Sequence, residues 1–377
     1  MARRLCGEEN YPAPLLAVAG HGRPDADRPF PARPLEDHAW SDLLTEARGH
    51  RLLGQLRAAV DSGALPTTAE QAQQARTIHR AVLLRVLSLE SELVAVCGLL
   101  TEAGIETRVL KGSAYAHLDY PDPALRTFID LDLLFRPADI ERAVAVLGGA
   151  GFARTLAEPR PGFDRRFDKG MTLRRGNGFE LDLHRTFVLG PWGVLVDLNA
   201  LWDTGQEFTV GGRGLLALSA PNRFLHACYH AALGDWPLRL GSLRDVAQLV
   251  PADERGQTAL IELATSWGVQ AVVAAAVADS TRLLGLHPIG TLASWAHGYV
   301  PSRREESWLA LHTHEGKTFA AQAIATLPVL PRLRDKAAYL RALVLPDGGY
   351  TEGRHSSAMS RFRFGVREAL RGRGTRG

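Results

Sequence analysis

The spacing of apolar residues predicts helices over the first third of the chain. From residue 36, the segment LEDHAWSDLLTEARGHRLLGQLRAAVDSG places apolar residues three and four positions apart, which predicts helical structure ending at Gly63. A second such pattern runs from about Thr68 to Ala103, and Gly104 suits its C-cap. Residues 1–35 are instead rich in Pro, Gly and Arg, and they predict a loose leader with little structure.

The pattern changes to short apolar runs from about residue 105. IETRVLKG predicts a short strand, SAYAHLDY a short helix, and TFIDLDLLF a strand of alternating character. PADIERAVAVLGGAGF predicts a helix with Pro137 at its first position. The turn residues Gly176, Asn177 and Gly178 separate two strand-like runs and predict a hairpin.

Helical patterns return after residue 219 and continue to about 345. We therefore expect an α+β fold, in which a small mixed sheet with its own helices is flanked by helices on both sides in sequence. The expected organisation is a loose leader (1–35), an N-terminal helical segment (36–104), an α/β core (105–218), a helical C-terminal domain (219–350) and a basic tail (351–377).

Composition supports an ordinary globular protein. Of its 377 residues, 46% are apolar and 23% are charged. There is no apolar run of about 18 residues and no secretory signal at the start, so we expect no membrane segment. Cys6, Cys97 and Cys228 show neither metal-ligand spacing nor a disulfide framework, which favours the cytoplasm, and Cys97 suits a small buried side chain.

Charge is concentrated at the C-terminal end. The net charge is +3, and the segment RHSSAMSRFRFGVREALRGRGTRG holds seven arginines against one glutamate. This tail could contact nucleic acid, an acidic peptide or phosphates, or it could be a solvated end. The rest of the chain is close to charge balance, so general binding of nucleic acid is not expected.

Two aspartates stand in the otherwise apolar run IDLDLL. In a strand, Ile129, Leu131 and Leu133 would face the core, whereas Asp130 and Asp132 would face the other way, about 7 Å apart. Two anions at that distance repel each other. They are tolerated on a wet face, or with a divalent cation such as Mg²⁺ between them.

A glycine turn lies upstream of this acidic run. Lys111 ends the predicted strand, and Gly112 and Ser113 open the short helix. Backbone N–H groups in such a turn suit a phosphate, although a plain strand-to-helix turn has the same pattern. Arg126 stands just before the acidic strand and could meet a phosphate through its guanidinium group.

A third acid occurs in the later run FELDLH. Glu180, Asp182 and His184 share one face of that predicted strand. If the strand pairs beside the first, Asp182 joins Asp130 and Asp132 in one cluster. His184 would then orient Asp182 or touch substrate, unless it is only a partly buried strand histidine.

These motifs together resemble a known family. The run VLKGSAYAHLDYPDPALRTFIDLDLLF, followed by FELDLH, resembles the bacterial uncharacterised nucleotidyltransferases of the polymerase-beta-like superfamily. The later FLHACYHAALGDWPLRLGSLRDVAQLV resembles the helical region of that family, so the resemblance covers roughly residues 36 to 250. Residues 114–129 separate the glycine turn from the acidic pair, a longer gap than the superfamily usually has.

The resemblance implies a small nucleotidyltransferase-like sheet and a metal-dependent enzyme. Such an enzyme moves a nucleoside monophosphate from a nucleoside triphosphate to a hydroxyl or phosphate of an acceptor, by in-line displacement with two Mg²⁺ or Mn²⁺ ions. Asp130 and Asp132 would hold both metals, and Asp182 would bind the catalytic metal and accept a proton. The acceptor is not named by the sequence; a small molecule or modified peptide is favoured over an RNA end.

The same resemblance assigns the nucleotide contacts. Gly112 and Ser113 would hold the β- and γ-phosphates, and Lys111 and Arg126 would offset charge on the pyrophosphate leaving group.

Further candidates lie in the helical half. His226 and His230 are four residues apart and share a helix face, where they could line the substrate cleft or simply pack. A zinc site is not expected, because no Glu stands between them as in H-E-x-x-H. Arg244 could touch substrate or form a local ion pair with Asp245, and Trp236 and Arg239 leave the same two alternatives.

Two other functions remain open from the sequence. One is a kinase-like or glycosyl-transferring use of the same fold. D-x-D also serves metal-bound nucleotide-sugars in glycosyltransferases, but those enzymes usually need a larger nucleotide-binding α/β domain before the motif, and here that part of the chain is predicted to be helical. The chain could also be a non-catalytic nucleotide-binding or antitoxin-like regulatory module, which has no chemical need for three acids on one face.

Overall fold

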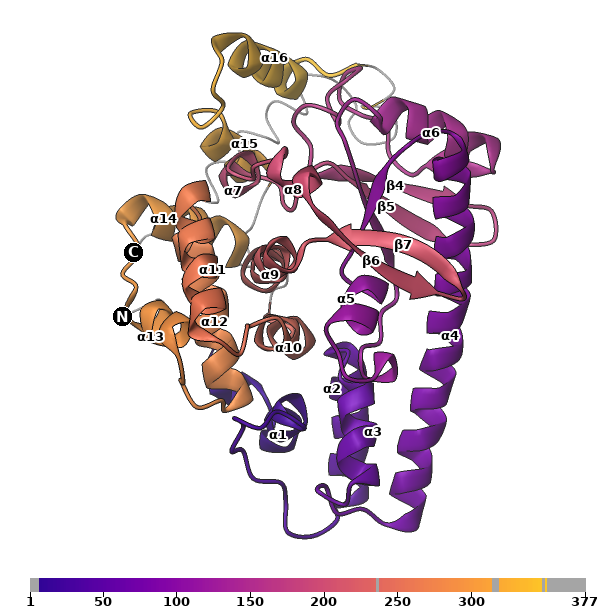
Figure 1. Ribbon diagram of the computed structural model, residues 1–377, viewed down its shortest axis with the longest axis vertical. Helices are drawn as coiled ribbons and strands as arrows, with labels where there is room; N and C mark the ends of the chain where they lie inside the picture. Colours follow the sequence, from indigo (N-terminus) through magenta and orange to yellow (C-terminus); the bar gives the residue numbers. More distant parts are fainter. Residues whose placement is uncertain (1–6, 235–236, 314–318, 348–349, 351–377) are drawn as a thin grey trace.

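A mixed sheet of seven strands lies between the N-terminal and C-terminal helices (Figure 1). The computed structural model describes residues 7–234, 237–313, 319–347 and 350. The sheet confirms the α+β class, and its strand order is β3 (Phe152–Arg154), β4 (Gly170–Arg175), β5 (Glu180–His184), β2 (Leu131–Phe135), β1 (Thr107–Leu110), β7 (Arg213–Leu218) and β6 (Gly205–Val210).

The pairing of the central strands brings the candidate acids together. β1 is antiparallel to β2, and β2 is parallel to β5 with Asp132 opposite Asp182. The expected hairpin is confirmed as the antiparallel pair β4–β5. A second hairpin, β6–β7, was not predicted, and β7 extends the sheet by parallel pairing with β1.

The N-terminal helices follow the apolar spacing with one interruption. The pattern over 36–63 forms two helices, α2 (Asp37–Gly49) and α3 (Leu53–Asp61), with Arg51 between them at a φ of 60°. The second pattern forms α4 (Ala69–Glu102), which starts with a capping box of Thr68 and Gln71. Gly104 follows α4 with a φ of 68°, as a C-terminal glycine should.

The expectation of a loose leader is wrong for the described part of residues 1–35. A 3₁₀ turn, η1 (Glu8–Asn10), precedes α1 (Ala13–Gly20), which packs against the C-terminal helices α10 and α12. Leu15 and Val18 are fully buried. The physical reason is the short apolar run PLLAVA, because burying it stabilises the fold more than the flanking Pro and Gly residues disfavour order.

Short helices connect the strands of the core. They are α5 (Ser113–Leu118), η2 (Pro123–Leu125), α6 (Ile140–Gly149), α7 (Pro191–Val194) and α8 (Ala200–Asp203). The C-terminal half contains α9 (Ala220–Tyr229), a π-helical turn η3 (His230–Gly234), α10 (Leu240–Gln248), α11 (Glu254–Trp267), α12 (Gln270–Leu284), α13 (Thr291–Gly298), α14 (Arg303–Thr313), α15 (Phe319–Thr326) and α16 (Leu333–Val344).

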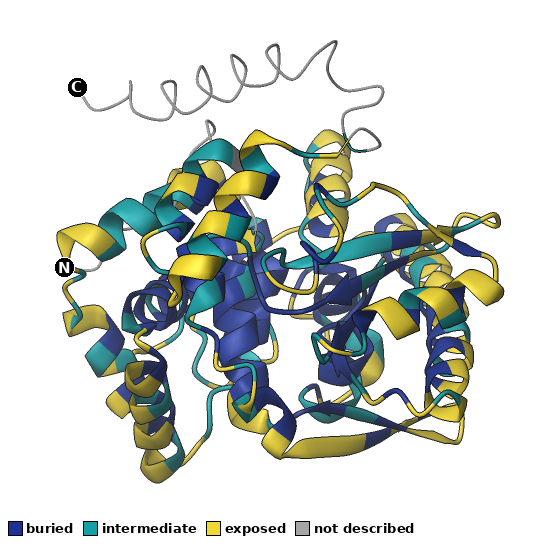
Figure 2. Cartoon of the chain, turned by 90° about the horizontal axis from the view of Figure 1, so that it is seen from above, coloured by how far each residue is buried: buried dark blue, intermediate teal, exposed yellow. Residues whose placement is uncertain are grey.

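Most of the apolar core is continuous from the helical half into the sheet. Figure 2 shows buried residues along the strands and along helices in the middle of the molecule, with exposed residues on the outer helices. The side chain of Cys97 is buried as expected, and Cys228 is buried as well. Within the described ranges, no helix is both long and apolar enough to cross a bilayer.

A buried ion pair also joins the helical half to the core. Arg223 in α9 donates two hydrogen bonds to the carboxylate of Asp119, which follows α5, at 2.7 and 2.9 Å. The basic tail (351–377) and Trp236 lie outside the described residues.

Candidate functional site

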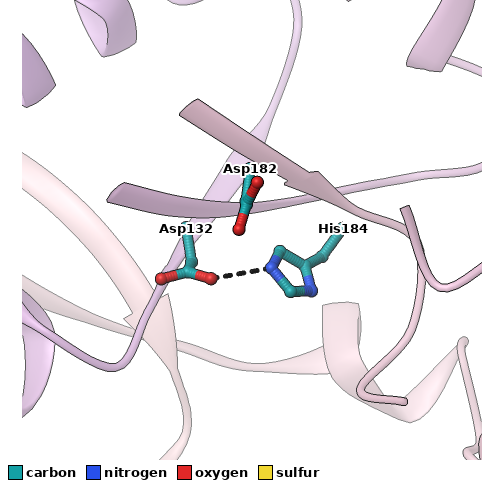
Figure 3. Close-up of side chains that lie close together, drawn as sticks. All are labelled: Asp132, Asp182 and His184. Carbon is teal, nitrogen blue, oxygen red and sulfur yellow. Dashed lines mark hydrogen bonds and ion pairs between the residues drawn. The ribbon is translucent and has the colours of Figure 1, made fainter. Parts of the chain in front are cut away.

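Two aspartates and a histidine meet on neighbouring strands (Figure 3). Asp132 lies in β2, and Asp182 and His184 lie in β5, where parallel pairing places the two acids in register. One ligand atom from each side chain lies within 4.8 Å of those of the other two. The expected pairing of the two acidic strands is therefore what the structure has.

Asp132 is held as a buried anion. Its side chain is 2% exposed, and its two oxygens lie 2.8 Å from His184 Nε2 and 3.1 Å from Lys111 Nζ. Burial by itself would raise the pKa of Asp132, but the positive charge of Lys111 and the hydrogen bond from His184 outweigh burial and hold this pKa well below its usual range. The carboxylate is therefore ionised wherever the protein is folded near neutral pH.

The structure decides against one of the two alternatives that the sequence left open for Asp132. All five residues of β2 are buried, so Asp132 does not lie on the wet face that was one of the two alternatives. β2 starts at Leu131, and the preceding Ile129 is 64% exposed, so its assignment to the core is wrong. Leu131 and Leu133 are buried as expected.

Asp130 lies just before β2 and outside the three-residue cluster. Its side chain is 31% exposed, and it forms ion pairs with Lys111 at 3.2 Å and Arg51 at 3.6 Å. Burial and the neighbouring Asp132 would raise the pKa of Asp130, but Lys111 and Arg51 outweigh them and lower it.

The turn after β1 has an unusual backbone. Lys111 has a φ of 32° and Gly112 a φ of 46°, both in the region that L side chains rarely adopt. A Cβ atom on Gly112 would also lie 3.3 Å from the ring of Phe128. The hydroxyl of Ser113 is buried and donates to Glu90 Oε1 at 2.6 Å, so the side chain ties the turn to α4.

Arg126 forms a buried ion pair inside the protein. It is 3% exposed and donates to both carboxylate oxygens of Asp245 at 2.6 and 2.7 Å and to the carbonyl of Thr127. The phosphate contact expected of Arg126 is therefore not what this geometry offers. Asp245 also accepts from Tyr120 at 2.8 Å.

Arg244 serves the same junction of core and helices. Its guanidinium donates to the carbonyls of Ala19 and His21 at 2.9 and 2.8 Å, which fixes α1 against α10. The local pair of Arg244 with Asp245 suggested by the sequence is replaced by the bidentate pair of Asp245 with Arg126.

Two cavities adjoin the acidic cluster. The first has a volume of about 300 Å³ and is lined in part by Asp164, Asp168, Thr172 and Asp182. The second has a volume of about 240 Å³ and lies toward the helical half, where Lys111, His226 and His230 line it. Lys169 and His184 line both cavities. Of the cluster, Asp182 lines the first cavity and His184 lines both, whereas Asp132 is not among the residues that line either.

The histidines differ in how they are held. His226 is buried, and its Nδ1 lies 2.8 Å from the hydroxyl of Tyr115. Burial, together with the neighbouring His230, keeps the pKa of His226 well below its usual value, so this ring is neutral. His184 is 3% exposed, and its Nδ1 has no hydrogen-bond partner within the described residues.

Three residues at the site were not predicted. Thr172 in β4 donates to Asp182 Oδ1 at 2.5 Å, and the hairpin register, with Thr172 opposite Asp182, could have identified it. Asp164 is paired with Arg154; burial and the nearby Asp168 raise the pKa of Asp164 to about 6. No sequence pattern singles out Asp164 or Lys169, because loops bring them to the cavity.

The cluster fits a divalent cation. Two carboxylates and an imidazole converge from two rigid strands, one carboxylate is ionised despite burial, and the second is oriented by a hydroxyl group. Oxygen ligands suit Mg²⁺ and Mn²⁺. Asp132 and Asp182 would hold the ion, and His184 would bind it or orient Asp132.

Comparison with known proteins identifies related sequences. The family model described as "Uncharacterised nucleotidyltransferase" matches residues 36–285. A search of curated proteins gave no significant match. Among solved structures, the antibiotic-resistance factor ANT(2'')-Ia has 17% identity and a TM-score of 0.32, and the match covers 52% of this chain and 92% of that one. An antigenic nucleotidyltransferase-like protein from Paracoccidioides brasiliensis has 17% identity and a TM-score of 0.29, with 50% and 92% covered.

Proposed function

This chain belongs to the family of uncharacterised nucleotidyltransferases, and we propose that it transfers a nucleoside monophosphate from a nucleoside triphosphate to an acceptor hydroxyl or phosphate. The observation that carries the proposal is the meeting of Asp132 and Asp182 on parallel strands, with Asp182 in the wall of the first cavity and His184 in the walls of both. A divalent ion, Mg²⁺ or Mn²⁺, would supply charge neutralisation at the reacting phosphate when bound.

Each residue of the cluster has a proposed role. Asp132 and Asp182 hold the metal, and Asp182, at the wall of the first cavity, accepts the proton of the acceptor hydroxyl. His184 keeps Asp132 oriented through the 2.8 Å hydrogen bond. Asp130 would join as a metal ligand only after releasing Lys111 and Arg51.

The two cavities suggest a division of the substrates. The triphosphate fits the second cavity, because Lys111 and Lys169 line it and would neutralise phosphate charge. The N–H groups of the Gly112 turn remain candidates for phosphate contact, as do His226 and His230 at the same wall. The acceptor would then occupy the first cavity, on the Asp182 side. The cytoplasm, where nucleoside triphosphates are made and used, is the proposed site of action.

The first experiment measures thermal melting with Mg²⁺ and each of ATP, GTP, CTP and UTP. Binding at about 100 times Kd stabilises a protein by roughly 2.7 kcal/mol, which gives a clear rise in Tm. We expect a rise with at least one nucleotide in the wild type and none in Asp132→Asn. The control Asp279→Asn removes another buried carboxylate, in α12, and it should keep the rise.

The reaction itself is tested with the responding nucleotide labelled at the α-phosphate. Transfer of this label to an acceptor pool, reduced at least about 100-fold in Asp132→Asn, would support nucleotidyl transfer. Transfer of a γ-phosphate label would indicate a kinase instead. If none of the four nucleotides raises the Tm, the proposal is wrong and a non-catalytic module becomes the better interpretation.

A further inference from the structure

The amino group of Lys111 lies between the two acids of the D-x-D run. Its Nζ atom is 3.2 Å from Asp130 Oδ2 and 3.1 Å from Asp132 Oδ2. The Lys111 side chain is 11% exposed, so little water screens these contacts. A monovalent cation of the protein itself therefore bridges the two carboxylates, which is the place where a metal ion was expected from the sequence.

Strand pairing and an unusual turn determine the position of Lys111. Lys111 follows β1, whose last residue Leu110 pairs with Asp132 across the antiparallel ladder. Its φ of 32° is rare for a residue with a side chain, and Gly112 continues the turn at a φ of 46°. The ring of Phe128 lies beside Gly112 and leaves little room for a side chain there. A disfavoured backbone conformation therefore occurs at the residue whose ammonium group contacts both Asp130 and Asp132.

The ammonium group and a metal ion cannot share this position. A cation bound between Asp130 and Asp132 would lie in direct contact with Lys111 Nζ, and two positive charges at that distance repel strongly. Even a metal held by Asp132 and Asp182 would compete with Lys111, because the carboxylate of Asp132 would then have to contact both the metal and the ammonium group.

A second place for the ammonium group lies close by. Lys111 also lines the 240 Å³ cavity, together with Lys169 and the histidines of α9 and η3. The long side chain can turn toward a phosphate in that cavity without movement of the backbone. The phosphate would then take over the partner role that the two aspartates play without a ligand.

We propose that Lys111 is an internal counter-cation that occupies the Asp130–Asp132 position until a nucleotide phosphate draws it away, so that metal and nucleotide bind cooperatively. This inference rests on the proposed function for its ligands. It adds that the wild type binds a divalent ion weakly by itself and that Lys111 is the cause. A lysine that only binds phosphate would not affect metal binding in the absence of nucleotide.

The test measures Mn²⁺ binding without nucleotide, by the loss of the free-ion electron paramagnetic resonance signal. The variants are Lys111→Met, which keeps the apolar stem of the side chain, and Lys169→Met, a matched control in the same cavity that does not bridge Asp130 and Asp132. We expect Lys111→Met to bind Mn²⁺ at least about tenfold more tightly than wild type. Lys169→Met should gain clearly less than Lys111→Met, because the charge of Lys169 acts on Asp132 but its ammonium group does not bridge the two acids. Adding Asp132→Asn to Lys111→Met should remove the gain.

Two outcomes would overturn the inference. Equal or weaker Mn²⁺ binding by Lys111→Met, or a gain that survives loss of the Asp132 carboxylate, would show that Lys111 does not occupy the metal's place. If Lys111→Met folds poorly without metal, the inference predicts that Mn²⁺ raises its Tm more than that of the wild type; an equal rise would contradict it. Lys111→Gln should behave in the same way as Lys111→Met.

The proposed function and the role of Lys111 are tested by different measurements. Nucleotide binding by the wild type with Mn²⁺ present, and its loss in Asp132→Asn, test the nucleotidyltransferase proposal. The Mn²⁺ affinity of Lys111→Met without nucleotide tests Lys111. Normal nucleotide binding with unchanged Mn²⁺ affinity in Lys111→Met would reject the counter-cation alone.

Discussion

The buried pair of Arg126 and Asp245 and the cluster around Asp132 are both charged groups inside the protein, but they differ in what surrounds them. The carboxylate of Asp245 accepts hydrogen bonds from Nε and Nη2 of Arg126 and from the hydroxyl of Tyr120, and all three residues are buried away from the two cavities near the cluster. In the Asp132 cluster, by contrast, Asp182 lines one cavity and His184 lines two, and His184 retains a ring nitrogen without a partner in the described part of the chain.

This difference separates structural charges from candidate functional ones. Arg126 and Asp245 lie 119 positions apart and hold the helical half against the core, so their pairing is complete in the folded chain. At the Asp132 cluster, Asp182 and His184 still border space that a ligand could fill. Burial and a shifted pKa occur in both places, and neither property by itself identifies the site.

The largest expected effect is on stability and comes from breaking the buried ion pair of Arg126 and Asp245. Asp245→Ala leaves the Arg126 guanidinium buried without its counter-charge, and we expect it to lower the free energy of unfolding by about 3–5 kcal/mol. Asp139→Ala removes the partner of Arg142 in an exposed pair, and should cost at most about 1 kcal/mol. Urea unfolding of both variants measures the difference. Similar losses for the two would mean that Asp245 contributes no more than a surface charge.

An intermediate effect is expected from removing a hydrogen bond at the cluster of Asp132, Asp182 and His184. Thr172→Val removes the hydroxyl group that orients Asp182, and we expect turnover to fall about 10- to 100-fold while the Tm changes little. The control Thr209→Val alters an exposed threonine of β6 and should keep full turnover. Steady-state transfer of the α-labelled phosphate provides the measurement. Unchanged turnover in Thr172→Val would show that Asp182 needs no fixed orientation.

The smallest expected effect concerns Asp164, which is buried beside the first cavity. Its pKa is about 6 in the folded protein, above the ordinary 3.8, so the folded state binds a proton more tightly than the unfolded state does. The stability that this proton provides is fully present at low pH and is lost as the pH rises through about 6.

Asp164→Asn removes that titration and keeps the size of the side chain. The Tm of the wild type minus the Tm of this variant should therefore fall by a few degrees between pH 4.5 and pH 7 and stay constant above pH 7. Melting curves across this pH range measure the difference. A difference that is constant, or that rises with pH, would show that the pKa of Asp164 is not raised.

Much of the local structure could be predicted from the chain. Helix α4, the hairpin β4–β5 and the short strand β1 follow from apolar spacing and turn residues, because these signals act between residues close in sequence. That α1 is an ordered helix could not be predicted from the residues next to it in the sequence. Its short apolar run is ordered only by packing against α10 and α12, more than two hundred positions away.

The site was predicted in its residue types more than in its arrangement. The sequence motifs singled out Asp130, Asp132, Asp182 and Lys111, but they assigned the same metal-binding role to Asp130 and Asp132. In the structure, Asp132 is buried with His184 and Asp182, and Asp130 is turned toward Lys111 and Arg51. Arg126 was assigned to a phosphate because its buried partner could not be known from nearby sequence.

The sequence by itself determined the α+β character, the family and the set of acids, since periodicity and motif residues are properties of the linear chain. Only the tertiary structure decided which acids meet and how they are neutralised. His184 and Asp132 are 52 positions apart and are joined by parallel strand pairing. Burial then makes each remaining charge depend on its nearest partner, because an ion removed from water is stabilised only by the groups that the fold places around it.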